Sequence, residues 1–337
     1  MNDLKELQSY HQLLRNEMIS FFDKNSSLIT RTEDLKIYDY LKEYSLRGKL
    51  IRGSLIILIN DVLTGKVNDD ALITATSLEV LHSSILVIDD IIDKDDVRRG
   101  KPSIHVIVKE LIPDSKDLDH DAQSIAQCVG LIGTYSAYMN LSRVNKDVTK
   151  QLSEEFVKTG FAELNEIILS QKEIVTNDDV MNIYKFKTAK YTITLPFKLA
   201  YILSGESFTE DLEKITDNIG ILFQFTDDLL ELDRSAEEIG KSNTSDIKAG
   251  KQHYPRKVLE ISVSDEDLLL LNQYYSDLSD ESVVKIKELY EKYDVADKTR
   301  KVINNLKEET VELIKEQDPR IRFLLEKLLN YVIERKF

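Results

Sequence analysis

The sequence predicts an all-α protein, and three observations favour that class. Its 337 residues include only 11 glycines and 5 prolines, the residues that most often punctuate strand-and-turn architectures. Apolar residues recur along most of the chain at the spacings of one helix face. No internal repeat, low-complexity segment or linker rich in Pro, Gly and Ser interrupts the pattern. We therefore expect a single domain over residues 1–337.

The apolar stripes also place the individual helices. The first stripe consists of Leu4, Leu7, Leu14, Met18 and Phe21. Further stripes predict helices over residues 34–45, 50–64, 70–93, 121–144, 148–172, 177–204 and 208–233. An irregular stretch follows at about 234–254, and four shorter helical patterns complete the chain. Asp318-Pro319 opens the last of them, because Pro does no harm in the first turn of a helix.

Two segments argue for another fold class. SLIILIN (54–60) and ILVIDD (85–90) are rich in β-branched residues and would also suit buried parallel strands. ILVIDD resembles the acidic strand end of a receiver-type α/β domain, in which paired aspartates bind magnesium. Such a fold needs strands that alternate with helices and short Gly-rich turns, and the rest of the chain lacks them. The all-α interpretation is therefore preferred.

Charge and cysteine content narrow the possible cellular locations and partners of the protein. The formal net charge is −15, whereas a protein that binds nucleic acid normally presents a basic face. Cys128 is the only cysteine, so an intramolecular disulfide is excluded and a cytosolic setting fits. The first residues lack the apolar region of a signal peptide, and apolar runs such as LIILI (55–59) are too short to span a bilayer. We expect a cytoplasmic protein with no transmembrane segment and no nucleic-acid partner.

The most informative stretch is SSILVIDDIIDKDDVRRGKPSIH (83–105), in which an apolar run ends in five aspartates. If residues 70–93 are helical, His82, Asp89 and Asp93 lie on one stripe of that helix. Like charges four residues apart cost roughly 0.2–0.5 kcal/mol, and carboxylates near a helix C-terminus cost roughly 0.3–1 kcal/mol each. A solvated acidic helix end is the alternative, but the preceding turns are apolar. Carboxylates that are placed against these helix preferences, without a structural gain, indicate a functional site.

These acids suit a magnesium site. Mg²⁺ typically binds through one or two carboxylates together with substrate phosphates. Arg98 and Arg99 follow the acids directly, and a guanidinium group offers paired donors for phosphate oxygens. The stretch therefore predicts that magnesium bridges the acids to a phosphorylated substrate.

A second acidic cluster supports this hypothesis. FQFTDDLLELD (223–233) ends another apolar helix and places on one of its faces Gln224, Asp227, Asp228 and Glu231. Basic residues suited to phosphate are Lys49, Arg52, Arg98, Arg99, Lys187, Lys241 and Lys251. The sequence shows no nucleophilic triad, P-loop or zinc-ligand spacing. A site of metals and cations without a nucleophile favours chemistry in which a diphosphate leaves as an anion.

Five motifs between about Leu46 and Pro255 resemble, in order, those of the trans-type polyprenyl diphosphate synthases, the family that makes farnesyl, geranylgeranyl and longer diphosphates. DDIID (89–93) resembles the first aspartate-rich motif, DDxxD, and VRRGKPSIH (97–105) resembles the segment that follows it. GKLIR (48–52) resembles the GKxxR motif, and His82 stands where the family has His or Gln. QFTDDLLE (224–231) resembles the second motif, QxxDDxxD, and GKSNTSDIKAGK (240–251) its continuation.

The chain departs from the family pattern at several positions. Gly53 stands where Pro is usual, and Glu231 stands where Asp is usual. AELNEI (162–167) only loosely resembles the usual G-Q/E-x-x-D. Glu in place of Asp keeps the carboxylate but moves it by one methylene, so direct metal binding by Glu231 is left open. None of these changes removes a residue assigned to diphosphate binding, and we expect an active enzyme.

The resemblance implies a fold and a set of site residues. The fold is an isoprenoid synthase-type bundle of long antiparallel helices around a central cavity, with the two acidic clusters facing each other across its mouth. Magnesium, three ions per site, would be held by Asp89, Asp93, Asp227 and Glu231. The substrate-binding residues would be Lys49, Arg52, His82, Arg98 and Arg99. The residues implied in catalysis are Asp89, Asp90, Asp93, Lys187, Thr188, Gln224, Asp227, Asp228, Lys241 and Lys251.

The implied reaction is the magnesium-dependent condensation of isopentenyl diphosphate with an allylic diphosphate (dimethylallyl, geranyl or farnesyl). The allylic substrate ionises, the double bond of isopentenyl diphosphate attacks the cation, and the departing diphosphate takes up the proton. Two rivals are a class I terpene cyclase and a non-catalytic regulatory subunit of a heteromeric prenyl synthase. GKLIR and the Arg98-Arg99 pair argue against the cyclase, and two acidic motifs argue against the subunit. The family also implies a homodimer.

Product length would depend on residues below the first acidic motif. Ile85 lies one helical turn before Asp89, about 6 Å deeper, and Ser84 lies beside it. In the family that the chain resembles, a large aromatic near these positions stops growth early. Because Ser84 is small and Ile85 only moderate in size, we expect geranylgeranyl rather than farnesyl diphosphate, and a shorter product if Phe replaces Ser84. Tyr135 and Tyr138 on the next predicted helix could raise the floor of the cavity and so shorten the product, but they are interpreted as core residues.

Overall fold

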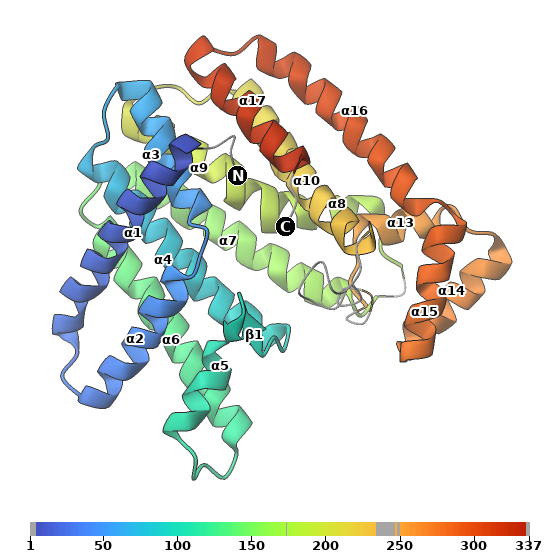
Figure 1. The fold of residues 1–337 in the computed structure, drawn as a ribbon, viewed down its shortest axis with the longest axis horizontal. Coiled ribbons are helices and arrows are strands. Elements are labelled where there is room, and N and C mark those ends of the chain that lie inside the picture. Colours follow the sequence, from blue (N-terminus) through green and yellow to red (C-terminus); the bar gives the residue numbers. More distant parts are fainter. Residues whose placement is uncertain (1–4, 173, 234–246, 248–249, 335–337) are drawn as a thin grey trace. The chain divides into compact units, whose positions relative to one another are not determined.

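The structure is a computed structural model, and it describes residues 5–172, 174–233, 247 and 250–334, except for the side chains of residues 5–7, 231 and 233. Within these residues the chain is helical apart from one two-stranded hairpin and the connecting segments (Figure 1). The predicted all-α class is therefore confirmed. Both segments that would also suit strands are helical, because residues 54–60 lie in α3 (Ile51–Thr64) and residues 85–90 lie in α4 (Asp69–Ile92).

The chain forms two compact units, which are described separately. Unit 1 comprises residues 1–153 and 196–207, and unit 2 comprises residues 154–195 and 208–337. The expectation of a single domain stays a prediction.

Unit 1 contains six helices from the first part of the chain and most of α9. Its elements are α1 (Lys5–Asn25), the 3₁₀ turn η1 (Ser26–Leu28), α2 (Thr32–Leu46), α3, α4, β1 (Val97–Arg98), β2 (Lys101–Pro102), α5 (Ile104–Ile107), the 3₁₀ turn η2 (Val108–Leu111), α6 (Leu118–Leu141), the first turns of α7 (Lys146–Leu169), and α9 (Leu195–Ser204) except Leu195.

Helix α4 is the central element of unit 1. It packs against α1, α2, α3 and α6, and the Asn68 side chain caps its start by accepting from the Ala71 N–H at 2.8 Å. By length and composition α4 would pass as a membrane span, but 78% of that apolar window is buried inside the structure. Gly133 lets α6 approach closely, because a Cβ there would lie 2.2 Å from Ser84 Oγ. The continuous apolar sequence of α4 is therefore that of a core helix.

A tight hairpin follows α4, and the apolar pattern does not predict it. Val97 pairs with Pro102 and Arg98 with Lys101. The two turn residues, Arg99 and Gly100, have φ values of 54° and 73°. Positive φ at both central positions matches the right-handed twist of a two-residue hairpin. The turn therefore folds the chain back at Arg98-Arg99, just beyond the end of α4.

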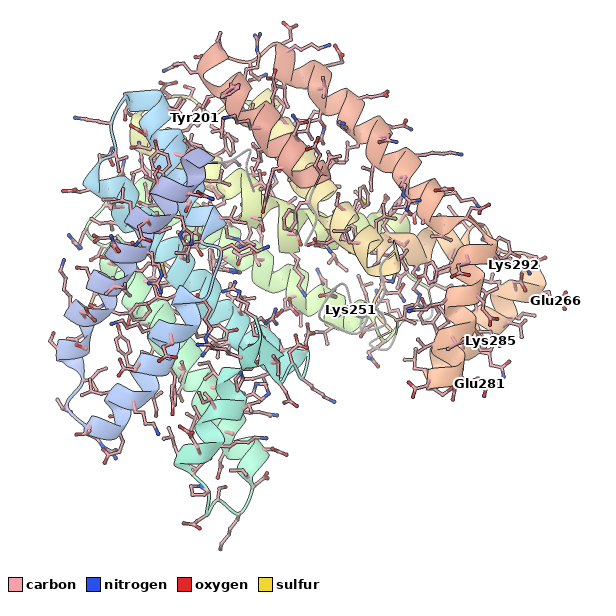
Figure 2. All side chains as sticks on the ribbon, viewed as in Figure 1. Tyr201, Lys251, Glu266, Glu281, Lys285 and Lys292 are labelled. Atoms are coloured by element: carbon pink, nitrogen blue, oxygen red, sulfur yellow. The ribbon has the colours of Figure 1, made fainter. Side chains whose placement is uncertain are left out.

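Unit 2 is arranged around α10 (Glu210–Asp233). Its other elements are the rest of α7, α8 (Asn177–Ile183), the π-helix η3 (Tyr184–Thr194), α13 (Tyr254–Glu260), α14 (Asp265–Asp277), α15 (Asp280–Lys292), α16 (Val295–Lys315) and α17 (Pro319–Ile333). Helix α10 packs against the π-helix, α16 and α17 (Figure 1). Charged side chains including Glu266 and Lys292 lie on the exposed surface of α14 and α15 (Figure 2).

Two expectations for this part of the chain are wrong in detail. The predicted continuous helix over 177–204 contains 11 π-helical residues, 184–194, between α8 and α9. The four shorter helical patterns are five helices in the described residues after 250, and α16 has 21 residues. Ser264 and Ser279 each cap the start of a new helix with the side-chain oxygen. Apolar periodicity continues across such caps, which is why the pattern alone counts too few helices.

Candidate functional site

In unit 1 the end of α4 meets the hairpin arginine. Arg98 Nε lies 2.5 Å from Asp90 Oδ1, and Arg98 Nη2 lies 3.0 Å from Asp89 Oδ2 and 3.2 Å from Asp95 Oδ2. Burial lowers the pKa of Arg98, but the charges of Asp90 and Asp89 outweigh it and raise the pKa. The positive charge of Arg98 therefore compensates the negative charge of these carboxylates, which is unfavourable near the C-terminus of α4.

The adjacent aspartates of this motif have different environments. The Asp90 side chain is 0% exposed, and it accepts a hydrogen bond of 2.7 Å from the Tyr44 hydroxyl on α2. Burial and the Asp90 charge raise the pKa of Tyr44, so the hydroxyl stays a donor. Asp89 is half-buried and Asp93 is exposed. Asp90 therefore holds Arg98 and Tyr44, whereas Asp89 and Asp93 remain accessible at the helix end.

A cationic cluster lies beside the same helix. Arg52 Nη1 is 3.2 Å from His82 Nε2, and a Cβ at Gly48 would lie 2.9 Å from Arg99 Nη1. Lys49 is exposed, three residues after the end of α2 at Leu46 and two before the start of α3. Unit 1 thus brings together Arg52, His82 and Arg99, three of the residues that the family resemblance implies in substrate binding.

His82 is neutral in this cluster. Burial and the nearby charges of Arg52, Arg99 and Arg98 hold its pKa well below the usual range. A guanidinium group can only donate, so Nε2 accepts the hydrogen bond from Arg52 and the ring proton lies on Nδ1. His82 therefore orients Arg52 without adding positive charge.

In unit 2 the predicted Lys187-Thr188 pair lies in the π-helix. Lys187 Nζ is 2.8 Å from Glu163 Oε2 and also contacts Glu166, both on α7. Thr188 Oγ1 donates to Gln224 Oε1 at 2.9 Å. π-Helical segments are found frequently at functional sites. Here the segment directs Lys187 toward α7 and Thr188 toward α10.

The second acidic motif repeats the arrangement of the first. Asp228 is 6% exposed, accepts from the Tyr184 hydroxyl, and accepts from Gln224 Nε2 at 2.8 Å. Asp227 is only half-buried. In both Asp-Asp pairs the second carboxylate is thus fixed by a buried tyrosine, and the first is left more accessible.

Three of the predicted residues need separate mention. Glu231 belongs to α10, but its side chain is not among the parts of the chain that the structure describes. Lys241 lies wholly outside the described residues. Lys251 is half-exposed in a segment without regular structure (Figure 2). Sequence reasoning missed Tyr44 and Tyr184, because nothing in their local pattern distinguishes them from ordinary helix positions. It assigned no role to Glu163, although this residue lies in the AELNEI segment (162–167) that loosely resembles a family motif.

The residues assigned to product length face different surroundings. Ser84 is 2% exposed, donates to Val80 O at 2.8 Å, and packs against Gly133 of α6. Ile85 is half-buried, on the same side of α4 as Asp89. The interpretation of Tyr135 as a core residue is wrong, since its side chain is 71% exposed. It lies on the outer face of α6, where helical periodicity alone does not show which side is covered.

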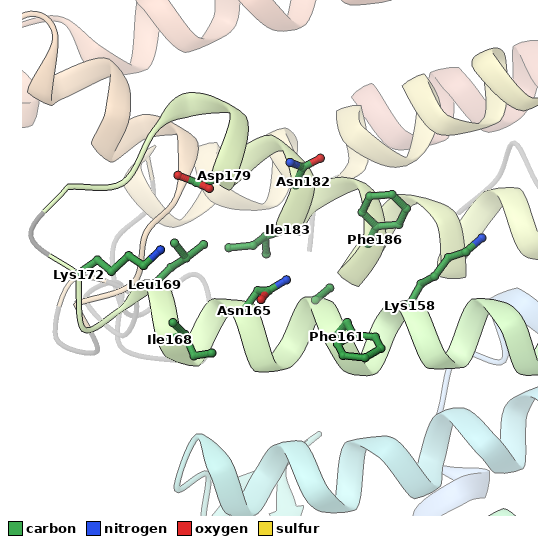
Figure 3. Close-up of a pocket in the computed structure, with 11 residues that line it drawn as sticks. Lys158, Phe161, Asn165, Ile168, Leu169, Lys172, Asp179, Asn182, Ile183 and Phe186 are labelled. Atoms are coloured by element: carbon green, nitrogen blue, oxygen red, sulfur yellow. The ribbon is translucent and has the colours of Figure 1, made fainter.

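A cavity of about 400 Å³ lies between α7, α8 and the π-helix in unit 2 (Figure 3). Phe161, Ile168 and Phe186 contribute apolar walls, and Lys158 and Lys172 lie toward its two ends. None of the site residues predicted from sequence lines this cavity. The cavity is therefore separate from the assigned residues.

We expect Asp90→Asn to lower the free energy of unfolding by about 2–3 kcal/mol, because it leaves the partly buried Arg98 guanidinium with weakened compensation. Urea unfolding followed by circular dichroism measures this loss. Asp93→Asn is the matched control on the exposed side of the motif, and its effect should stay within about 0.5 kcal/mol. Equal losses in the two variants would contradict the distinct role of Asp90.

The low pKa of His82 makes stability depend on pH. An unfolded histidine takes up a proton below about pH 6.5, whereas the folded, neutral His82 does so only at much lower pH. Its contribution is therefore present above about pH 6.5 and is lost as the pH falls toward the folded pKa. Between about pH 7.5 and about pH 5, the wild type should lose roughly 1–2 kcal/mol more stability than His82→Gln. Parallel losses in urea titrations of both proteins would contradict this.

Comparisons with known proteins show the family to which the chain belongs. The family model of polyprenyl synthetase matches residues 35–293. A geranylgeranyl diphosphate synthase of Cyanophora paradoxa is 32% identical over 75% of this chain and 85% of its own length. A farnesyl pyrophosphate synthase of Candida albicans is 28% identical over 80% of this chain and 78% of its own length.

A solved structure shows the same fold. It is the geranylgeranyl pyrophosphate synthase of Corynebacterium glutamicum, complexed with isoprenyl diphosphate and magnesium. The two structures superpose with a TM-score of 0.87 at 22% identity, and the match covers 98% of this chain and 99% of the other. Since the family model spans most of the sequence, the chain belongs to the polyprenyl synthetase family and is a prenyltransferase.

Proposed function

We propose that this protein is a magnesium-dependent short-chain trans-prenyl diphosphate synthase, which condenses isopentenyl diphosphate with an allylic diphosphate. One observation carries the proposal: α4 presents accessible carboxylates at its end and, about two turns earlier, His82 beside Arg52. A single rigid helix thus offers a metal-type and a diphosphate-type subsite. Relatives named farnesyl and geranylgeranyl diphosphate synthases support the same activity.

Magnesium fits the ligands that the acidic motifs offer. Asp89, Asp93 and Asp227 supply hard carboxylate oxygens at helix ends, and each is at least partly exposed. In the described parts of the chain, no three His, Cys, Asp or Glu side chains gather closely enough to hold a metal ion. Mg²⁺ usually needs only one or two carboxylates, with water and substrate phosphate completing its shell. When bound, it would act as a Lewis acid that stabilises the leaving diphosphate.

The cationic cluster of unit 1 suits the second substrate. The charges of Arg52 and Arg99 act on each other and on His82. Lys49, in the segment between α2 and α3, precedes Arg52, and Arg52 is oriented by the neutral His82. Forked guanidinium donors match phosphate oxygens. Isopentenyl diphosphate does not ionise in the reaction, so it needs binding charge rather than an acid. We assign this cluster to isopentenyl diphosphate.

The catalytic assignments in unit 2 follow from its contacts. Lys187 is held by Glu163 and Glu166, and Thr188 is linked through Gln224 to Asp228. The second set of contacts aligns a hydroxyl and an amide with the second acidic motif, and Lys187 adds a cation on the same π-helix. We propose that these groups support the allylic diphosphate and shield the cation that forms when it leaves.

The activity is tested by incubating the purified protein with labelled isopentenyl diphosphate, magnesium and each allylic diphosphate in turn, and separating the products by chain length. We expect incorporation into one main product, and a loss of about a hundredfold or more when EDTA removes the metal. Conversion of the allylic substrate without use of isopentenyl diphosphate would instead indicate a cyclase. Binding of substrate without turnover would indicate a regulatory subunit.

We further propose geranylgeranyl diphosphate as the main product. Ile85 lies one turn before Asp89 on the same side of α4 and is of moderate size. Ser84 is a poor place for a test, because a large residue there would have to displace α6 at Gly133.

Ile85→Phe should therefore shorten the main product, from geranylgeranyl toward farnesyl diphosphate, because the ring obstructs the path of the growing chain. Chromatography of dephosphorylated products measures the change. Ser84→Ala adds no volume to the same turn and should leave product length unaltered. A product unchanged by Ile85→Phe would show that another residue sets the chain length.

We also propose that the protein is a cytoplasmic homodimer. Helix α6 carries exposed apolar side chains, at Leu131, Ile132, Tyr135 and Met139. Apolar residues at this density on one helix are typical of a surface that a partner covers, and a second copy is the simplest partner.

A further inference from the structure

Helix α3 begins without a cap of its own. Its N-cap residue is Leu50, whose side chain cannot accept a hydrogen bond, and whose φ of 48° is left-handed. The first amides of a helix have no intrahelical acceptor. The first intrahelical bond of α3 runs from Ser54 N to Leu50 O, so the amides before Ser54 need an acceptor from elsewhere.

Glu79 of α4 supplies that acceptor. It is 2% exposed, and its Oε1 accepts from the Gly53 N–H at 2.8 Å. Burial raises the pKa of Glu79, while the charge of Arg52 and hydrogen bonds from the Gly53 and Arg52 amides oppose that rise. A carboxylate at this end of a helix also has a favourable interaction with the macrodipole. Glu79 thus caps α3 from a different helix.

Gly53 is suited to this contact in a way that the usual Pro is not. Proline has no N–H to donate. A Cβ at position 53 would lie 2.9 Å from Glu79 Cγ, 2.9 Å from Ala75 O and 2.6 Å from Leu14 Cδ2. The glycine therefore provides both the donor and the close approach of α3 to α4. The contact with Glu79 therefore explains why this chain has Gly53 where the family usually has Pro.

The residues that Glu79 holds adjoin the cationic cluster. Lys49 and Arg52 flank the left-handed Leu50, so the direction of both side chains depends on that backbone conformation. A left-handed, non-glycine residue is strained and persists only when neighbouring contacts hold it. The charges of Arg52 and Arg99 both act on Glu79, which also offsets the mutual repulsion of these arginines.

We propose that Glu79 is a positioning residue for diphosphate binding: it caps α3 through Gly53, and so holds Lys49 and Arg52 in the geometry that one diphosphate group requires. The proposal rests on the proposed function, because it assigns this cluster to isopentenyl diphosphate. Glu79 itself touches no substrate. Its contribution is to order the backbone before the substrate arrives.

Steady-state kinetics of Glu79→Gln and Glu79→Asp test the proposal. Gln keeps the length of the side chain and one acceptor oxygen, whereas Asp keeps the charge but withdraws the acceptor from Gly53. We expect KM for isopentenyl diphosphate to rise about tenfold for Gln and further for Asp. KM for the allylic substrate and kcat should change by less than about threefold.

Ser83→Ala is the matched control. Ser83 is a buried polar residue on the next turn of α4, and its hydroxyl bonds only within the helix, to Glu79 O at 2.9 Å. This variant should leave both KM values unchanged, and circular dichroism should show all variants folded at the assay temperature. A selective rise in KM separates positioning from general stability, because a loss of folded protein lowers apparent kcat and leaves KM unchanged.

Three other results have clear meanings. Unchanged KM for isopentenyl diphosphate, or equal changes for both substrates, would overturn the proposal. Unfolding of both Glu79 variants but not of Ser83→Ala would assign Glu79 to folding and overturn it as well. If the wild type uses no isopentenyl diphosphate, the proposed function fails, and calorimetric titration with inorganic diphosphate then decides: weaker binding by Glu79→Gln supports positioning, and equal binding overturns it.

Discussion

The buried contact between Asp90 and Arg98 organises the functional part of unit 1. A carboxylate with no solvent exposure needs a partner, and Arg98 reaches it only because the hairpin turns the chain back after α4. That turn also sets Arg99 over Gly48, next to the segment that carries Lys49 and Arg52. Asp89 of α4 contacts the same guanidinium group, so two carboxylates hold the hairpin against the end of the helix. The position of Arg99 beside the cationic cluster therefore depends on the burial of Asp90.

In both acidic motifs the second aspartate is buried and the first is more accessible. Asp90 and Asp228 are each buried and each accept from a tyrosine hydroxyl, Tyr44 in unit 1 and Tyr184 in unit 2. A buried, fully bonded carboxylate is poorly suited to exchange ligands, whereas a half-exposed one can. The second aspartate of each pair thus stiffens the helix end, so that the first aspartate is presented in a defined place. Preorganised charge of this kind is what stabilisation of a leaving diphosphate requires.

Most of the architecture was predictable from local pattern, and the residues proposed for the site were selected from sequence motifs. The all-α class, the positions of α2, α3, α4 and α10, and the start of α17 at Pro319 follow from apolar periodicity and capping. The π-helix and the extra helix boundary do not, because periodicity near 3.6 hardly differs across either feature. The roles of Tyr44 and Glu79 could not be predicted from the local sequence either. They act on residues 46 and 26 positions away, so their roles exist only once the helices have packed.

The sequence by itself determined the family, the acidic motifs and the basic residues suited to diphosphate, since these are matters of residue type and spacing. Only the tertiary structure decided which members of each motif face inward. Asp90 and Asp93 are chemically identical, and burial alone makes one a structural partner of Arg98 and leaves the other exposed. Likewise, Gly53 is a departure from pattern in the sequence and a hydrogen-bond donor in the fold. Burial and long-range hydrogen bonding depend on which helices meet, and spacing along the chain does not encode that.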